Sequence, residues 1–359
     1  MSSLIIEVCK IENIITLENA DKLEMVQVKG WNCLVGKGQY KIGDLVVFVP
    51  PDSIIPNELI DRYELTYLRH GGRVGTTKLR GYISQGLILD LPNGKFKVKD
   101  DVTEILGITK YEHPEPKISI TGRQISKKKL NSMFDKYTEI ENINNYPDIF
   151  EQSDYIVITE KIHGSNFRAA NLEIEISRNQ PFFYCLKKMF EKYILKRKYE
   201  FIIGSHNVQL ISDKNYYDKN IYRIIADKYD LKNKIPEGYI LYGEIYGKGV
   251  QELTYGLDNI DLAIFDIKDQ RGYISWDLVR EFCLERDLKT PPVLYEGEWI
   301  NDLYKIYTTG NSLLSSKSQI REGCVIKCIP EKYHPRIGRK ILKSINPEYL
   351  LKKDRTDFH

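Results

Sequence analysis

The sequence has little of several features that would assign a function directly. Its six cysteines contain no CxxC pair, and Glu7 interrupts the apolar start of the chain, so neither a disulfide framework nor a signal peptide is expected. We therefore expect a soluble intracellular protein, in the cytoplasm, the nucleus or a viral factory. No apolar run approaches the ~18 residues of a membrane span, and we expect no membrane partner.

The chain also lacks a large excess of charge of either sign. Its 53 lysines and arginines against 50 acids leave a net charge of +3, so bulk charge does not explain binding to nucleic acid. Any such surface must be local. The Gly-Lys-Gly sequences at 36–38 and 247–249 lack the frame of a phosphate-binding P-loop, which excludes that class of nucleotide enzyme.

The composition present is that of a folded protein with room for two domains. Of 359 residues, 42% are hydrophobic and 29% are charged. Residues 1–110 contain short alternating runs separated by glycine and proline turns, which predicts a small antiparallel barrel. A five-stranded OB-type barrel fits the size, and other small barrels fit it nearly as well. The predicted strands include 25–28, 31–35, 45–49 and 86–89.

The second half predicts a different architecture. Residues 111–150 are polar and marked by prolines, and we expect a linker that ends in a short helix. Strands and helices alternate from 151 to 359, which predicts an α+β domain. The expected strands are 155–159, 167–176, 201–204, 239–246, 262–267 and 323–326. The expected helices are 182–199, 219–230, 275–288 and 299–307.

A lysine at a strand end is the most informative residue of this second domain. The segment Thr159–Arg168 is a β-branched strand that runs into Lys161 and turns at Gly164. Alone, a K-x-x-G sequence is more often an ordinary hairpin with a solvated lysine. It gains weight because further segments follow in order, namely Tyr242–Gly247, Ile264–Ile267, Arg321–Lys327 and Lys340–Lys343.

Together these five segments resemble motifs I, III, IIIa, IV and V of the covalent nucleotidyltransferases. Within that superfamily, TEKIHGSNF is similar to the version found in ATP-dependent RNA ligases. The resemblance implies an N-terminal OB barrel followed by an α+β nucleotidyltransferase domain, of the ATP-grasp-like ligase kind, with antiparallel sheets. Segments that resemble the leading OB module of such ligases are Ala20–Glu24, Gly30–Trp31, Gly43–Asp44, Pro51–Ser53 and Thr77–Gly86.

The resemblance implies that Lys161 is the catalytic nucleophile. In the family this lysine attacks the α-phosphorus of ATP and carries AMP, which passes to a 5′-phosphate before a 3′-hydroxyl displaces it. An amine with a free pKa of about 10.4 needs desolvation or nearby positive charge for this role. A divalent ion, Mg²⁺ or Mn²⁺, is expected on Glu244 and Glu322, directly or through water.

The same resemblance implies further contacts with the nucleotide. Phe265 is expected to stack on adenine, with plain core packing as the alternative. Glu160 is expected to help read adenine, and Asn166 and Arg168 are expected near the sugar or the phosphates. The other expected members of the nucleotide site are Ile162, His163, Gly164, His206, Lys327 and Lys343.

Three features depart from the family pattern. His163 stands where the wider superfamily has aspartate. Ile345 occupies the place of a second motif V lysine, and Lys327 is a candidate substitute for that cation. Motif Ia is either Ser177–Asn179 or Gly204–Asn207, and the later segment is favoured because a predicted strand leads into it.

The predicted helix at 182–199 carries six basic residues. Either this face is solvated and the helix packs through Phe190 and Ile194, or the face follows a nucleic-acid backbone. Small barrels often bind single strands through basic side chains, and the loops of the predicted barrel carry such side chains. The candidate contacts with nucleic acid are Lys187 and Lys188 on the helix and Lys78 and Arg80 on the barrel.

These observations favour a monomeric ATP-dependent RNA ligase that seals 3′-hydroxyl and 5′-phosphate ends in nicked, RNA-containing duplexes. A capping-type guanylyltransferase and a DNA ligase are the enzyme alternatives. The 16 residues after Lys343 leave no room for the C-terminal OB domain that both of these carry. The alternative of a different class is a non-catalytic RNA-binding protein with a relic nucleotidyltransferase domain.

Overall fold

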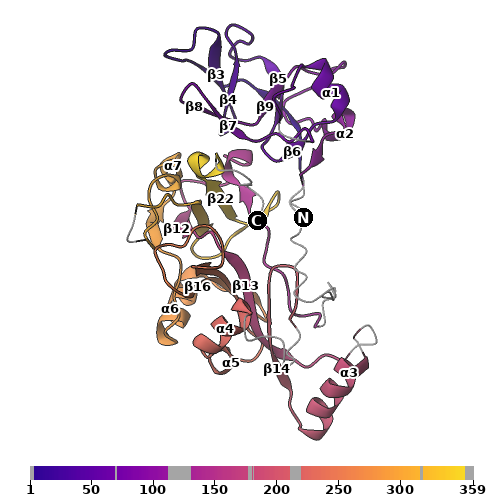
Figure 1. Ribbon diagram of the computed structural model, residues 1–359, viewed down its shortest axis with the longest axis vertical. Coiled ribbons are helices and arrows are strands. Elements are labelled where there is room, and N and C mark those ends of the chain that lie inside the picture. Colours follow the sequence, from indigo (N-terminus) through magenta and orange to yellow (C-terminus); the bar gives the residue numbers. More distant parts are fainter. Residues whose placement is uncertain are drawn as a thin grey trace.

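The computed structural model describes residues 4–68, 71–111, 131–176, 180, 182–210, 220–315 and 318–351. Figure 1 shows an N-terminal β domain in indigo and purple and a larger mixed domain coloured from magenta to yellow. The predicted α+β class, with mostly antiparallel sheets, is confirmed. Within the described residues, no helix is long and apolar enough to cross a membrane.

The N-terminal domain is built from short antiparallel strands, and the four predicted strands are present. Strand alternation explains its core, since Trp31, Cys33 and Val35 are buried and the residues between them are partly exposed. Its strands are β1 (Glu7–Lys10), β2 (Asn13–Thr16), β3 (Leu23–Val28), β4 (Trp31–Gly36), β5 (Leu45–Val49), β6 (Ser53–Ile54), β7 (Thr76–Leu79), β8 (Tyr82–Gln85), β9 (Leu87–Leu89) and β10 (Thr109–Lys110). Its helices are α1 (Asn57–Arg62) and α2 (Thr103–Leu106).

The region expected to be a linker, residues 111–150, is described only in part. Residues 112–130 lie outside the described part of the chain. From residue 131 the chain belongs to the second domain, because Phe134 and Tyr137 are buried in one of its apolar clusters. The short helix expected here is a 3₁₀ turn, η1 (Ile143–Asn145), which follows strand β11 (Glu141–Asn142).

Two five-stranded sheets form the second domain. One has the order β11-β22-β19-β12-β18 and the other the order β14-β13-β15-β16-β17. The pairs are antiparallel except for β11 with β22. The strands are β12 (Tyr155–Lys161), β13 (Ser165–Glu173), β14 (Tyr199–Gly204), β15 (Ile240–Gly247), β16 (Ile260–Asp269), β17 (Gly272–Tyr273), β18 (Val293–Glu298), β19 (Gly323–Cys328) and β22 (Ile341–Ile345), with a small hairpin of β20 (Tyr333–His334) and β21 (Gly338–Arg339).

The helices lie near their predicted positions, with two shifts at their ends. The helix expected at 182–199 ends at Ile194 because β14 begins at Tyr199. The helix expected at 299–307 begins only at Leu303. The helices are α3 (Phe182–Met189) with the π-helical turn η2 (Phe190–Ile194), α4 (Ile221–Lys228), α5 (Leu231–Lys234), α6 (Trp276–Glu285), α7 (Leu303–Thr308) and α8 (Pro347–Leu350).

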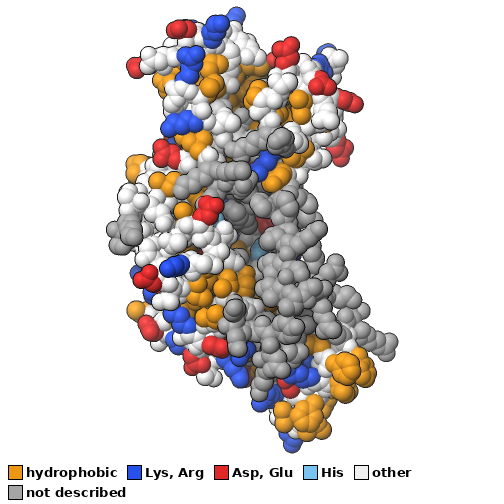
Figure 2. All heavy atoms as spheres, in the orientation of Figure 1, with side chains coloured by type: hydrophobic (Ala, Val, Ile, Leu, Met, Phe, Trp, Pro, Cys, Tyr) orange, Lys and Arg blue, Asp and Glu red, His pale blue; other side chains and the backbone are white. Residues whose placement is uncertain are grey.

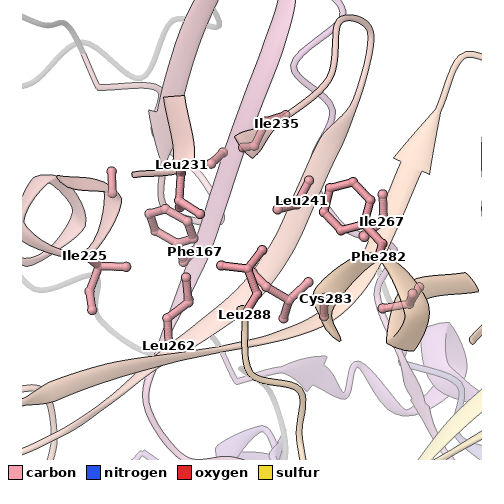
Figure 3. Close-up of a cluster of buried hydrophobic side chains, with 14 of the residues drawn as sticks. Phe167, Ile225, Leu231, Ile235, Leu241, Leu262, Ile267, Phe282, Cys283 and Leu288 are labelled. Carbon is pink, nitrogen blue, oxygen red and sulfur yellow. The ribbon is translucent and has the colours of Figure 1, made fainter. Parts of the chain in front are cut away.

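The largest apolar cluster lies between the β13–β16 sheet and helices α4, α5 and α6 (Figure 3). Phe167 and Leu241 enter it from neighbouring strands, and Ile225, Leu231 and Phe282 enter it from the helices. Burial of each such side chain stabilises the fold by about 1.5–3 kcal/mol. Val157 of β12 also belongs to this cluster, which therefore links the two sheets.

The two domains meet at the β11–η1 segment. The Trp31 indole donates a hydrogen bond to Asn145 Oδ1 at 3.0 Å, and the Gly30 amide donates to the Asn144 carbonyl at 3.4 Å. A Cβ on Gly30 would lie 2.5 Å from Asn144 Oδ1, so this close approach requires glycine. The barrel is therefore attached to the strand that pairs with β22.

Candidate active site

The chain passes from one sheet to the other between Lys161 and Ser165. Lys161 ends β12 opposite Gly323 of β19, and β13 begins directly after the turn, with Asn166 opposite Glu244 of β15. The turn passes so close to β15 that a Cβ on Gly164 would lie 2.1 Å from the Ile245 carbonyl oxygen. The crossing therefore brings residues from both sheets to one point.

Lys161 lies in a cluster of acidic side chains. Its Nζ is 2.7 Å from Glu322 Oε1, and 18% of the Lys161 side chain is exposed against 1% of Glu322. The second carboxylate oxygen of Glu322 is buried and has no hydrogen-bond partner among the described residues. A buried carboxylate oxygen without a partner is costly, which indicates that a ligand belongs beside it.

Glu244 is the second acid of the cluster. Burial raises the pKa of its carboxyl to about 8, Lys161 opposes that rise and Glu322 adds to it. The Oδ1 of Asn166, in register with Glu244, is also buried with no described hydrogen-bond partner. Carboxylate and amide oxygens are the donors that a hard divalent cation prefers.

His163 is fixed within the same turn. Its backbone N–H donates to the Tyr255 hydroxyl at 2.6 Å, and its ring Nδ1 lies 2.9 Å from the Tyr349 hydroxyl. The same nitrogen is 4.0 Å from Glu322 Oε2. The two tyrosines were not anticipated from the sequence, where neither the residue spacing nor a motif connects them to the turn.

Lys343 shares a sheet face with Lys161. Thr159, two residues before Lys161, is opposite Val325, and Val325 is opposite Lys343. Side chains two apart in a strand point to the same face. Lys343 also lines a hollow between the domains, together with Trp31 of the barrel. Lys343 of β22 therefore lies on the same side of the sheet as Lys161.

A family model described as RNA ligase matches residues 154–345, which is more than half of the chain. The chain belongs to the RNA ligase family. A second model, described as an OB-fold domain, matches residues 5–91. The prediction of an RNA ligase in which an OB module precedes a nucleotidyltransferase domain is confirmed.

Solved structures similar to this ligase include the RNA ligase of Naegleria gruberi. A lysine-to-methionine mutant of that protein with AMP and Mn is 24% identical, covers 98% of this chain and 100% of its own, and gives a TM-score of 0.74. The same protein with pyrophosphate is 25% identical, with 98% and 100% of the two chains covered and a TM-score of 0.72. No curated protein matches the sequence.

Three residues expected at the nucleotide have other contacts in this ligase. Glu160 points to the opposite face of β12 from Lys161, and its carboxylate accepts hydrogen bonds from the Ser312 hydroxyl and the Leu313 amide. Ile162 is buried in an apolar cluster. Neither side chain joins the acidic cluster, and their contacts with adenine stay a prediction.

Arg168 is the third of these residues. Its guanidinium donates to the backbone carbonyls of Phe134, Asp135 and Ser205 at 2.8–3.0 Å and lies over the Phe134 ring. Burial lowers its pKa to about 10. Arg168 thus joins residues 134–135 to β13 and β14, and its expected place near the sugar or the phosphates stays a prediction.

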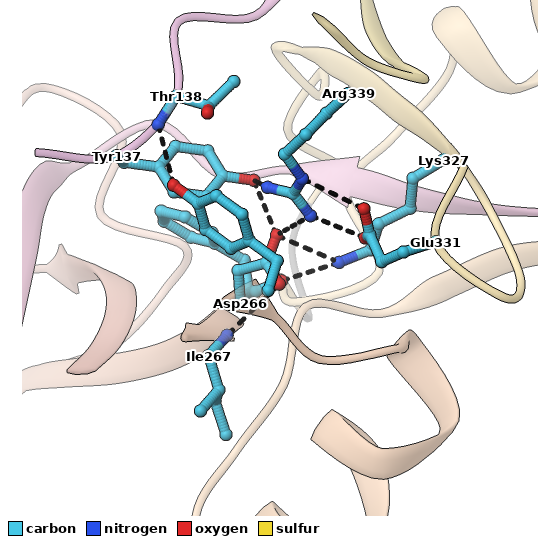
Figure 4. A network of polar contacts seen from close by, with 9 residues as sticks. Tyr137, Thr138, Asp266, Ile267, Lys327, Glu331 and Arg339 are labelled. Atoms are coloured by element: carbon cyan, nitrogen blue, oxygen red, sulfur yellow. Dashed lines mark hydrogen bonds and ion pairs between the residues drawn. The ribbon is translucent and has the colours of Figure 1, made fainter. Parts of the chain in front are cut away.

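Lys327 also differs from its expected role as a phosphate cation. Its Nζ donates to the Phe265 carbonyl at 2.8 Å and lies 3.7 Å from Asp266. Figure 4 shows this lysine in a buried network in which Asp266 also binds Arg339 and Tyr137. Burial lowers the pKa of Lys327, and Asp266 opposes that change. The lysine is held in the network and not at the cluster of Lys161.

Phe265 is the extra residue of a bulge, because Tyr242 pairs with Asp266 and Gly243 with Ile264. A bulge redirects the side chain that it carries. The Phe265 ring is partly buried and lies edge-on to Tyr137 at 4.8 Å. Its stacking on adenine stays a prediction.

The favoured motif Ia segment follows β14 as predicted, and Gly204 pairs with Arg168. His206, in this segment, has a pKa lowered by burial and then by Lys136 and Arg168. The alternative segment at 177–179 lies outside the described residues. A nucleotide contact of His206 stays a prediction.

The candidate contacts with nucleic acid divide into exposed and buried side chains. Lys78 and Lys187 are exposed, and Arg80 is exposed while donating to the Asn19 carbonyl at 3.1 Å. Lys188 is buried and ion-paired with Glu200 at 2.6 Å, which does not favour the predicted contact with nucleic acid. The expected packing of the helix through Phe190 and Ile194 was also wrong, because both are largely exposed.

Proposed function

We propose that this ligase uses ATP and a divalent metal to form lysyl-AMP on Lys161, and then seals nicks in RNA-containing duplexes as a monomer. The observation that carries the proposal is the position of the Lys161 amine, 2.7 Å from Glu322 and beside Glu244 where the two sheets meet. The Naegleria gruberi ligase has been solved with ATP and Mn, with AMP and Mn, and with pyrophosphate. ATP, AMP and pyrophosphate are the substrate and the products of an adenylyl transfer.

The first step makes a bond from Lys161 Nζ to the α-phosphorus and breaks the bond to pyrophosphate. Lys161 attacks as an uncharged amine, after it leaves Glu322 and gives a proton to solvent. The exposure of 18% of its side chain leaves a path for both the phosphate and the proton. Gly164 keeps the turn close to β15, so the amine approaches from a fixed direction.

The acidic cluster fits a divalent cation. Glu322 Oε2, the Glu244 carboxylate and Asn166 Oδ1 are oxygen donors, and two of these atoms have no described protein partner. A bound Mg²⁺ or Mn²⁺ would neutralise these acids and stabilise negative charge on the phosphate oxygens. In the described residues no cluster of three or more His, Cys, Asp or Glu side chains surrounds one point, so water and phosphate must complete the coordination.

The later steps use the same side of the sheet. AMP passes from Lys161 to the 5′-phosphate of the break, and the 3′-hydroxyl then displaces AMP to form the phosphodiester. Lys343 lies on this face and supplies positive charge where the phosphates exchange. The proposal assigns the barrel residues that line the interdomain hollow to contact with the strand that leaves the site.

The adenylylation test uses Lys161→Arg and Lys161→Met with labelled ATP or GTP and Mn²⁺. Arginine keeps a cation beside Glu322 but is always protonated and does not attack phosphorus. Label should enter the wild type from ATP alone and should be absent from both variants. The matched control is Lys232→Arg on α5, an exposed lysine that should keep wild-type labelling.

Labelling from GTP would favour a capping enzyme, and labelling that survives in Lys161→Arg would reject Lys161 as the nucleophile. The sealing step is tested on nicked duplexes with ribose or deoxyribose on each side of the break. Sealing should require ribose on at least one side. Equal sealing of an all-DNA nick would overturn the proposed RNA substrate.

A further inference from the structure

Helix α3 and the turn η2 pack against the protein through their polar side. The buried Lys188 ammonium is ion-paired with Glu200 of β14 at 2.6 Å and with Glu191 at 2.7 Å. Tyr184 donates from its hydroxyl to Glu200 at 3.4 Å. Surface helices normally bury their apolar stripe and expose the polar one, so this helix is inverted.

The apolar side of the same helix faces water. Between 53% and 81% of each of six side chains is exposed, namely Phe182, Phe183, Leu186, Phe190, Tyr193 and Ile194. Figure 2 shows these hydrophobic groups gathered at the lower tip of the molecule, where Figure 1 places α3. Contiguous apolar patches of this kind mark interaction surfaces on soluble domains.

Basic side chains surround this apolar face. Lys187 is exposed on α3, and Lys196 and Arg197 are exposed directly after η2. Lys198 is exposed and paired with Glu173 at 3.2 Å, and the Lys192 ammonium donates to the Ile174 carbonyl at 3.1 Å, so the charges open to a partner are mainly those of Lys187, Lys196 and Arg197. The only acid between residues 182 and 198 is Glu191, which is occupied by Lys188. A partner for this face must therefore combine an apolar interior with negative charge at its surface.

We propose that α3 and η2 lie on an anionic lipid surface, with the phenylalanines in the acyl boundary and the lysines at the headgroups. An amphipathic helix with aromatic and aliphatic residues on one side and Lys or Arg at its rim binds such a surface without crossing it. The expectation of no membrane partner rested on the lack of a spanning segment. A helix that lies on the surface needs no such segment.

RNA and a second copy of the chain fit the face less well. RNA offers phosphates and base faces but no apolar surface for Leu186 and Ile194. A second copy would bring two basic rims together. The helix also lies at the far end of β13 from the catalytic turn, about 26 Å along the strand, so a bound surface leaves Lys161 open.

The test is co-sedimentation of the full chain with vesicles of phosphatidylcholine, alone or mixed with phosphatidylserine. The wild type should sediment with the mixed vesicles, and added salt should weaken that binding. Phe183→Glu with Phe190→Glu should lower the partition at least about tenfold. The control Leu284→Glu, at a side chain that is 84% exposed on α6, should bind like the wild type.

Lys196→Glu with Arg197→Glu should remove the preference for phosphatidylserine, and the control Lys232→Glu should keep it. All variants should retain adenylylation of Lys161 by ATP in solution, which separates this proposal from the ligase chemistry. Absence of binding to the mixed vesicles would overturn it. Two other outcomes would also overturn it. In these, the wild type forms a dimer in light scattering or binds RNA in a shift assay, and the double phenylalanine variant loses that interaction but still binds vesicles.

Discussion

Substitution of Gly164 by alanine tests whether the turn between Lys161 and Ser165 depends on close contact between the two sheets. The added Cβ would lie 2.1 Å from the Ile245 carbonyl oxygen and 3.0 Å from the Glu244 Cγ. Non-bonded heavy atoms need more than about 3 Å, so the turn or β15 must move by about 1 Å. Overpacking of this kind costs about 1–3 kcal/mol of stability.

The effect on catalysis should exceed the effect on stability. The displaced strands carry Lys161 at one side and Glu244 at the other, and a misplacement of about 1 Å costs on the order of 10²-fold in rate. The assay is the single-turnover rate of labelling by ATP, measured beside unfolding in urea followed by tryptophan fluorescence. Gly36→Ala in β4 is the control, because its Cβ would meet only the flexible Gln39 side chain at 3.2 Å.

The control should change stability by no more than about 0.5 kcal/mol and leave the labelling rate unchanged. A Gly164→Ala enzyme that labels at the wild-type rate would refute the argument that the turn geometry positions the amine. A variant that loses stability by the expected amount but keeps its rate would separate packing at the turn from the approach of Lys161 to ATP.

Two further predictions concern buried carboxylates away from Lys161. Burial alone would raise the pKa of Asp261, but hydrogen bonds from Lys289, Tyr229 and Lys228 lower it to about 2. Its ionised form therefore stabilises the fold above pH ~4, and this stability is lost as the pH falls toward 2. Asp261→Asn should lower the free energy of unfolding by about 1–2 kcal/mol at pH 7, after allowance for solvent screening. In urea unfolding, the difference in stability between the variant and the wild type should shrink as the pH falls. A difference that does not change with pH would contradict this. Asp266→Asn should destabilise the fold by about 3–5 kcal/mol, because it leaves Lys327 and Arg339 buried without their carboxylate. A variant that unfolds at the same urea concentration as the wild type would contradict this prediction.

Period-two alternation and turn residues were sufficient to predict most of the fold. The strands at 31–35 and 262–267 alternate or form buried runs bounded by turn residues, and both lie in the structure where predicted. The strand β18 was missed because half-exposed Tyr295 and the acids around it do not resemble a buried strand. The residues near Phe134 were assigned to a linker because the sequence around them is polar. Phe134 and Tyr137 nevertheless pack in an apolar cluster with residues of the β13–β16 sheet.

The sequence could predict which site residues lie close together only where the path of the backbone decides it. Lys161, Glu244 and Glu322 were named from their order along the chain, and the sheet crossing brings them together. The contacts of Glu160 with Ser312 and Leu313, on the face of β12 opposite to Lys161, had no signal in the sequence. Tyr255 and Tyr349, which hold His163, come from distant segments with no local signal.

The lysines of the last two motifs show why sequence alone distinguishes a structural lysine from a phosphate-binding one poorly. Ile345, opposite Gly323 across the sheet, fills the place of a second cation with a buried apolar side chain. Lys340 is ion-paired with Asp154 at 2.6 Å, and Lys327 is held by Asp266. These carboxylates lie far from the lysines in the chain, so no spacing rule assigns the pairs. Lys343 lies on the same face of the sheet as Lys161, and we predict that it is the motif V cation. A lysine's chemistry depends on which carboxylate the fold places beside it.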